Sequence, residues 1–224
     1  MVPTAIILQV RVGSTRLPGK LLLPLGDKSI FEHVLIRLLQ ARIPSSLVVA
    51  TTADTVPHIE KIAKSYGVSI HIGSEEDVLL RFVEARRRFR IDTIVRATGD
   101  NPLVCIPYID RAVSLHREQG SDLTMFPLLP YGTGVEVIRG RVLEEAHDKA
   151  SDPFEREHVT RYLYNHESEY RIVRGIPERA LQKPHVRLTV DTEEDYRVMR
   201  GIYENLYQGK PIDLHEALRY LENR

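Results

Sequence analysis

Apolar residues along the chain alternate between short continuous runs and stripes with a helical period. The runs are rich in β-branched residues and predict strands at 5–8, 47–51, 68–72 and 93–97. The stripes have apolar residues three or four positions apart and predict helices at 29–42, 56–66, 76–89 and 107–119. This repeated strand–helix order predicts an α/β fold with a mainly parallel sheet covered on both faces.

The second half of the chain has a less regular pattern. Further apolar runs predict strands at 122–126, 135–138, 170–174 and 186–190. Further stripes predict helices that begin at Arg141 or span 154–166, 192–206 and 213–222. We find no internal repeat and no clean linker, and therefore expect one domain over 1–224. Its irregular stretch, roughly 123–184, predicts a lid or an acceptor-binding lobe.

The composition indicates which class of protein this is and which partners are unexpected. The 224 residues are 42% hydrophobic and 28% charged, which is typical of globular proteins. Lys+Arg and Asp+Glu both number 31, so no basic excess is available to neutralise a nucleic acid. The basic run at 86–90 lies on a predicted helix with an apolar face. We interpret it as a solvated helical face, with RNA binding as a minor alternative, and expect no nucleic-acid partner.

The single cysteine and the absence of long apolar stretches bear on the cellular compartment in which the protein is expected. Cys105 stands alone, which excludes an internal disulfide and fits a reducing environment. A lone cysteine can be a nucleophile, but a buried small hydrophobe is the commoner role. The first residues do not resemble a signal peptide, and no run reaches the length of a membrane span. We expect a cytoplasmic protein with no membrane partner.

The segment QVRVGSTRLPGK, from Gln9 to Lys20, carries the most chemical information. It follows the first predicted strand and contains two glycines, two hydroxyl residues and three cationic side chains. Glycine lets backbone N–H groups turn toward an anion, and Arg or Lys adds full positive charge. Open α/β sheets bind ligands at such strand ends. The segment therefore predicts a polyphosphate site, the alternative being a basic surface turn.

The two common phosphate motifs do not match this loop. A P-loop has four residues between its glycines and a hydroxyl residue after the lysine. Here five residues separate Gly13 from Gly19, and Leu21 follows Lys20. The G-x-G-x-x-G pattern fails as well, because no third glycine has the required spacing. The loop is therefore expected to be a different kind of phosphate cradle.

Two aspartates follow predicted strands that precede helices. Asp100 occurs in RATGDNPL and Asp191 in RLTVDT, so both are expected at carboxyl strand ends. Mg²⁺ is usually held by one or two carboxylates, several waters and substrate phosphates. Joint placement with the cations of the loop favours a Mg²⁺ site formed by Asp100 and Asp191. The alternative is helix capping, which Asp191 or Thr192 could provide for the next helix.

Three of these segments together resemble a known family. QVRVGSTRLPGK, RATGDNPL and RLTVDTEEDYRVMR are similar to signature segments of the cytidylyltransferases that activate sugars, such as CMP-KDO and CMP-sialic acid synthetases. The segments HIGSEEDVLLRF (71–82) and REHVTRYL (156–163) are most similar to the branch of spore coat polysaccharide biosynthesis proteins. The resemblance covers nearly the whole chain, with the motifs in the expected order.

The resemblance implies a fold, a reaction and a set of site residues. The fold would be a three-layer, GT-A-like (Rossmann-like) nucleotidyltransferase fold. The reaction would transfer CMP from CTP to a sugar or sugar acid, with release of pyrophosphate, in surface polysaccharide biosynthesis. Mg²⁺ would be the cofactor, on Asp100 and Asp191. The irregular lobe would also serve dimerisation, and the protein would be a homodimer.

Carried over residue by residue, the resemblance assigns roles around the nucleotide. Arg16, Lys20 and Asp100 would be catalytic. The nucleotide would be contacted by the loop and by the predicted strand ends, at Gln9, Arg11, Gly13, Ser14, Arg16, Lys20, Ser74, Thr98 and Gly99. Among these, Gly13 and Ser14 would contribute backbone N–H groups. No feature of the residues themselves selects cytosine.

The acceptor side is less well defined by the sequence. The sugar-acid enzymes commonly carry an acidic residue after their Gly-Asp pair, whereas this chain has Asn101. Polar side chains that could line an acceptor pocket are Glu136, Arg156, Glu157 and His158. His158 could act as a base, although a surface histidine is the commoner case. His158 and His166 lack the spacing of a zinc site, and the absence of G-x-S-x-G argues against a Ser-His-Asp hydrolase.

Two other classes of function remain as alternatives. A glycosyltransferase on a GT-A-like fold would use a nucleoside diphosphate sugar, but it usually has a D-x-D motif that is missing here at a strand end. A catalytically idle binding or scaffold protein would not need both candidate metal carboxylates and the phosphate cations. The nucleotidyltransferase is therefore the favoured interpretation.

Overall fold

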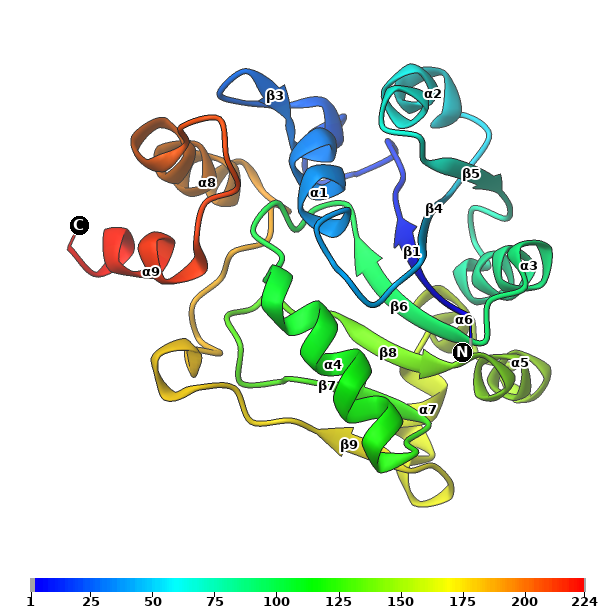
Figure 1. Ribbon diagram of the computed structural model, residues 1–224. Helices are drawn as coiled ribbons and strands as arrows, with labels where there is room; N and C mark the ends of the chain where they lie inside the picture. Colours follow the sequence, from blue (N-terminus) through cyan, green and yellow to red (C-terminus); the bar gives the residue numbers. More distant parts are fainter. Residues whose placement is uncertain (1–2, 224) are drawn as a thin grey trace.

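The central sheet is built around the first apolar run of the chain. In the computed structural model, which describes residues 3–223, seven strands follow the order β5-β4-β1-β6-β8-β7-β9 (Figure 1). One half is parallel and consists of β1 (Thr4–Gln9), β4 (Ser46–Thr51), β5 (Ser69–Ile72) and β6 (Thr93–Thr98). The other half consists of β7 (Leu123–Met125), β8 (Glu136–Arg139) and β9 (Ile172–Arg174). Strand β8 is antiparallel to both of its neighbours, and β9 is parallel to β7, so the predicted mainly parallel sheet is confirmed.

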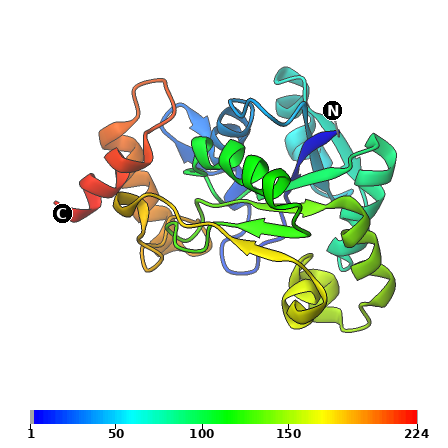
Figure 2. The same cartoon turned by 60° about the horizontal axis from the view of Figure 1, so that its bottom comes forward.

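The sheet is buried on both faces, as its continuous apolar runs predict. Ala5 and Ile7 of β1 pack with α3 (Val78–Phe89), α5 (Gly140–Lys149) and α7 (Arg161–Asn165). Ile6 and Leu8 pack on the opposite face with α1 (Ile30–Leu38), α2 (Val56–Ser65) and α4 (Ile106–Gln119). Figure 2 shows α4 on one face of the sheet and the yellow-green helices α5 to α7 on the other. The α/β class and its three layers follow from this arrangement.

A third apolar cluster brings the end of the chain back beside the first loop. Helices α8 (Glu193–Leu206) and α9 (Leu214–Glu222) pack there with Tyr108, Leu188 and Val190. A short hairpin of β2 (Pro24–Leu25) and β3 (Lys28–Ser29) lies beside α8 and was not predicted. Within residues 3–223 the connections also contain three 3₁₀ turns, namely η1 (Lys20–Leu22), η2 (Glu167–Glu169) and η3 (Arg179–Leu181).

The predicted helix at 154–166 is wrong in one respect, because it is broken in the middle. Helix α6 (Pro153–Glu157) ends at His158, and α7 begins after Thr160. Between them Val159 is fully buried and adopts φ 30°, an uncommon conformation for a β-branched residue. The break lets the Val159 side chain enter the core while the Thr160 hydroxyl donates to Glu136. Tertiary contacts therefore outweigh an apolar pattern that indicates one helix.

The predicted strand at 186–190 is also wrong. This segment is extended, but it forms only an isolated bridge between Arg187 and Tyr131. Its backbone N–H groups donate outside the sheet, from Leu188 to Tyr131 and from Val190 to Asp100. The segment therefore ties the two loops at residues 131 and 100 together instead of extending the sheet.

Two expectations from composition can be compared with the structure. Cys105 is buried, and desolvation raises the pKa of its thiol to about 11, which supports the role of a small core residue. Within residues 3–223, none of the helices combines the length and the apolar character needed to span a membrane.

Candidate active site

The loop after β1 is shaped by contacts to neighbouring strand ends. The Val12 N–H donates to the Thr55 hydroxyl at 3.0 Å, and the Thr51 hydroxyl donates to the Val10 carbonyl at 3.0 Å. Gly19 adopts φ 66°, which a glycine tolerates without strain, and the chain then enters η1. The Ser14 N–H donates to the Val12 carbonyl at 2.7 Å, so this group is engaged within the loop rather than directed at a ligand.

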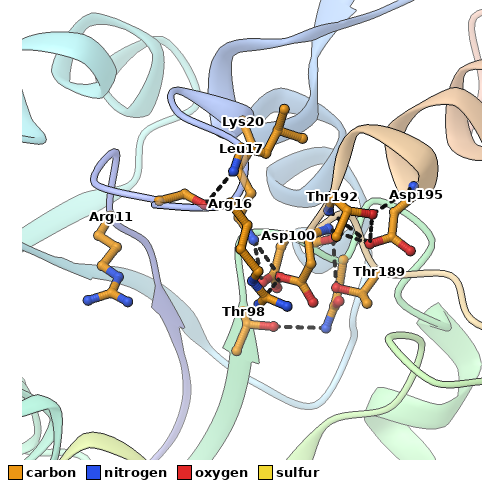
Figure 3. Close-up of polar contacts among 12 residues, drawn as sticks. Arg11, Arg16, Leu17, Lys20, Thr98, Asp100, Thr189, Thr192 and Asp195 are labelled. Atoms are coloured by element: carbon orange, nitrogen blue, oxygen red, sulfur yellow. Dashed lines mark hydrogen bonds and ion pairs between the residues drawn. The ribbon is translucent and has the colours of Figure 1, made fainter.

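Lys20 lies between the two predicted metal ligands. Its ammonium donates to Asp100 Oδ2 at 3.0 Å and to Asp191 Oδ1 at 2.8 Å. Figure 3 shows Arg16 and Lys20 reaching from the loop toward Asp100, with Arg11 on a separate limb of the loop. The structure therefore brings together the phosphate loop and both carboxylates, although Asp191 lies 171 positions beyond Lys20 in the chain.

Asp191 is surrounded by cations. Besides Lys20, Arg16 approaches its Oδ1 at 3.3 Å, and Arg187 donates to its Oδ2 at 2.5 Å. Burial would raise the pKa of Asp191, but the hydrogen bond and charge of Lys20, with Arg16 and Arg187, outweigh it and lower the pKa. Asp191 is therefore an ionised carboxylate in the folded protein at neutral pH.

The capping alternative for Asp191 is not what the structure shows. Thr192 caps α8 by accepting from the Asp195 N–H, and the Asp195 carboxylate accepts from the Thr192 N–H in return. This capping box satisfies the first turn of the helix without the Asp191 side chain. The Asp191 carboxylate is thus available for the loop cations.

Two adjoining cavities open beside these residues. The loop-side cavity has a volume of about 260 Å³ and is lined by the phosphate loop, the end of β6 and Asp191. The lobe-side cavity has a volume of about 520 Å³ and extends over residues 125–136 and Tyr164. Both cavities are lined by Gln9, Arg16, Arg96, Thr98, Asp100, His158 and Asp191. Together they form one cleft at the carboxyl ends of β1 and β6.

Most of the predicted site residues line this cleft. Those on the loop-side cavity are Gln9, Arg11, Ser14, Arg16, Lys20, Thr98, Gly99, Asp100, His158 and Asp191. Glu136 lines the lobe-side cavity. Gly13 is not among the residues that line either cavity, and a Cβ atom added there would be 3.8 Å from Glu75 Oε1. At Gly99 a Cβ atom would lie 2.5 Å from Val10 Cγ1, so only glycine fits between β6 and the loop.

The structure does not bring Ser74 and Arg156 to either cavity. The Ser74 hydroxyl accepts from the Asp77 N–H, and its carbonyl accepts from the buried Arg81. Arg156 donates to Asp77 at 2.7 Å and to the carbonyl groups of His147 and Ala150. Both side chains therefore organise the start of α3 and its contact with α6. Their direct contact with a ligand, expected from the sequence, has no support in the geometry.

Glu136 is held by a network that the sequence did not indicate. Its carboxylate accepts from Arg96 at 2.6 Å, from the Thr160 hydroxyl at 3.1 Å and from the Tyr164 hydroxyl at 2.5 Å. Arg96 is the one charged residue in the strand TIVRAT, and that contrast could have marked it as a site residue. Tyr164 and Thr160 carry no comparable signal, because their direction depends on the break before α7.

The cleft offers two carboxylates, Asp100 and Asp191, as possible ligands of a metal ion. Within residues 3–223 no group of three or more His, Cys, Asp or Glu side chains could hold a metal ion. Asp100 and Asp191 nevertheless direct one oxygen each at a single ammonium, so one cation can contact both. Mg²⁺ usually takes one or two carboxylates and completes its shell with water and phosphate. The pair fits that kind of ion rather than one that needs an all-protein cage.

Comparison with known proteins identifies the family. The model of the cytidylyltransferase family matches residues 5–223. The chain belongs to the cytidylyltransferase family. It is therefore a nucleotidyltransferase enzyme, as the resemblance of its motifs implied. Family membership agrees with the placement of the loop cations and the two aspartates in one cleft.

Individual relatives of this cytidylyltransferase cover most of its length. It is 37% identical over 193 residues to the spore coat polysaccharide biosynthesis protein SpsF of Bacillus subtilis, covering 83% of this chain and 80% of SpsF. It is 38% identical over 187 residues to protein MJ1063 of Methanocaldococcus jannaschii, covering 83% and 77% of the two chains. A cytidylyltransferase structure from Leptospira borgpetersenii superposes with a TM-score of 0.92 at 30% identity, covering 100% of this chain and 95% of that one. The predicted nucleotidyltransferase fold is thereby confirmed.

Proposed function

We propose that this cytidylyltransferase transfers CMP from CTP to a sugar or sugar acid in surface polysaccharide biosynthesis, with Mg²⁺ as cofactor. The observation that carries the proposal is Lys20, which places the phosphate loop in direct contact with Asp100 and Asp191. Two relatives support the substrate class, the spore coat protein SpsF and a 3-deoxy-manno-octulosonate cytidylyltransferase of Geobacter sulfurreducens. The latter is 34% identical over 110 residues, 48% of this chain and 43% of that protein.

The loop-side cavity would hold the triphosphate. Arg16 and Lys20 would stabilise the leaving pyrophosphate, and Arg11 would contribute a third positive charge. An acceptor oxygen attacks the α-phosphorus in line with the leaving group, so positioning and charge stabilisation dominate over covalent chemistry. Mg²⁺ on Asp100 and Asp191 would supply further positive charge to the phosphate oxygens.

The lobe-side cavity would hold the acceptor. Glu136 is fixed by Arg96, Thr160 and Tyr164, and would accept hydrogen bonds from acceptor hydroxyl groups. His158 lines both cavities, and would contact the acceptor beside the reacting phosphate. Arg156 would act indirectly, because its bond to Asp77 holds α6 in place. The homodimer expected from the family resemblance stays a prediction.

A thermal-shift panel followed by a pyrophosphate assay tests the proposal. CTP, UTP, ATP, GTP, UDP-sugars and GDP-sugars are compared with and without Mg²⁺. A ligand at one hundred times its dissociation constant stabilises the native state by about 2.7 kcal/mol. A Mg²⁺-dependent shift with CTP alone, followed by pyrophosphate release with a sugar or sugar acid, is the expected result. A shift only with a diphosphate sugar would instead support a glycosyltransferase, and no shift at all would support an idle scaffold.

A further inference from the structure

Lys20 lies at the point between Asp100 and Asp191 where a divalent cation would bind. Its ammonium contacts one oxygen of each carboxylate at 3.0 and 2.8 Å, and its side chain is buried. Two carboxylates directed at the same point repel one another unless a cation lies between them. In the free protein Lys20 provides that cation.

The two aspartates are held in place by groups other than Lys20. The Asp100 carbonyl accepts from the Val190 N–H at 2.8 Å and from the Thr189 hydroxyl at 3.3 Å, which ties the two aspartate segments together. Arg187 donates to the second oxygen of Asp191 and is itself held by Asp195. The backbone of Asp100 and the carboxylate of Asp191 therefore stay held when the ammonium of Lys20 moves away.

We infer that Lys20 is an exchangeable counter-ion that prevents divalent metal binding until a polyphosphate draws it away. The inference rests on the proposed function and adds an order of binding to it. Lys20 also lines the loop-side cavity, so a triphosphate bound there offers its ammonium another anion. A metal ion that arrives alone must break both carboxylate contacts of Lys20 without replacing them. Metal and nucleotide therefore bind together, and each raises the affinity for the other.

Arg16 provides a matched control for the effect of charge. It approaches the same Asp191 oxygen as Lys20, at 3.3 Å, but its side chain is 64% exposed. No contact joins it to Asp100 within the described part of the chain. Removing Arg16 therefore subtracts one positive charge from the site without vacating the position between the carboxylates.

The test measures binding of Mn²⁺ alone, without nucleotide, by the electron paramagnetic resonance signal of the free ion. Lys20→Met should bind Mn²⁺ at least about tenfold more tightly than the wild-type protein, because the two carboxylates lose their resident cation. Arg16→Met should increase the affinity for Mn²⁺ much less. Lys20→Gln serves as a second variant if the methionine side chain prevents folding, and circular dichroism verifies each fold.

Three outcomes would overturn the inference. Saturable Mn²⁺ binding to the wild-type protein that Asp100→Asn abolishes would show that Lys20 does not block the site, and this arm needs no Lys20 variant. An equal gain in Mn²⁺ affinity in Lys20→Met and Arg16→Met would show that net charge, and not the position of Lys20, controls metal binding. No binding to any folded Lys20 variant would show that the carboxylates do not form a metal site.

The same samples separate this inference from the proposed function. A CTP-induced thermal shift of the wild-type protein in Mg²⁺ tests nucleotide binding without reference to Lys20. If CTP binds but Mn²⁺ alone binds equally well to the wild type and to Lys20→Met, only the order of binding fails. If CTP does not bind, the proposed function fails, and the Mn²⁺ titrations still report on Lys20.

Discussion

The two cavities of the cleft differ in the exposure and pairing of their charged side chains. On the loop side, the guanidinium groups of Arg11 and Arg16 belong to side chains that are 45% and 64% exposed. On the lobe side, Arg96 and Glu136 are paired at 2.6 Å, with side chains only 20% and 17% exposed. The exposed guanidinium groups can meet a polyphosphate directly, unlike the buried ammonium of Lys20, whereas the pair on the lobe side already neutralises itself. The difference agrees with the proposed placement of the triphosphate on the loop side and of the acceptor on the lobe side.

The largest effect is expected where the two cavities share a carboxylate. Asp100→Asn removes the charge of a proposed metal ligand, and we expect turnover to fall by about 10³-fold in a pyrophosphate-release assay. Asp148→Asn, at an exposed position on α5, is the matched control and should keep full activity. Unchanged turnover in Asp100→Asn would remove the basis for treating the loop side as a metal–phosphate site.

A pH titration sharpens the comparison, because the histidines whose pKa values are lowered by burial lie outside both cavities. Burial lowers the pKa of His116 from 6.5 to about 4, and burial also lowers the pKa of His33 and of His71. The unfolded histidine therefore takes up a proton first, so its contribution to stability is complete above pH 6.5 and is lost as the pH falls toward 4. For His116 this amounts to about 3 kcal/mol.

Urea unfolding at a series of pH values measures this loss. His116→Gln should flatten the pH dependence, while His58→Gln, at an exposed position on α2, should leave it unchanged. A full pH dependence in His116→Gln would place the sensitive group elsewhere, and the carboxylates of the cleft would then need to be tested.

The paired charges of the lobe side can be tested through stability. Arg96→Met leaves the half-buried Glu136 without its ion pair, and we expect a loss of about 2 kcal/mol in the free energy of unfolding. Arg16→Met removes an exposed arginine and should change stability by less than about 0.5 kcal/mol. Equal losses from the two substitutions would contradict the distinction between paired and accessible charges.

The smallest effect is expected at the rim of the lobe-side cavity. Tyr131 is 58% exposed there, and Arg187 lies over its ring at 5.0 Å. Tyr131→Ala should raise the KM for the acceptor a few-fold, which corresponds to a loss of about 1 kcal/mol in acceptor binding. The KM for CTP should stay unchanged. Pyrophosphate-release kinetics with varied CTP or varied acceptor separates these constants. A higher KM for CTP would mean that nucleotide extends into the lobe side.

The loop side could be predicted from the sequence because its residues are close together in the chain. Gln9, Arg16 and Lys20 lie in one segment after an unmistakable buried strand, and Asp100 follows another. Their local spacing already places them at the same edge of the sheet. The contact of Lys20 with both aspartates could not be predicted, since it depends on how α8 packs far along the chain.

The lobe side could be predicted only in part. Glu136 and His158 reach the cleft, but Arg156, two positions before His158, turns toward Asp77. That direction follows from the end of α6 and the buried Val159, which only the folded core determines. Where short elements take their shape from tertiary contacts, side-chain direction is not encoded in local periodicity.

The tie between the Val190 N–H and the Asp100 carbonyl has a consequence for synthesis. Strands β1 to β6, the loop and its cations are all made before the segment that carries Asp191. A growing chain can therefore form a cationic loop next to Asp100 while the second carboxylate is still missing. Both carboxylates are in place only after residues 187–191 have been made and the Val190 N–H has reached the Asp100 carbonyl.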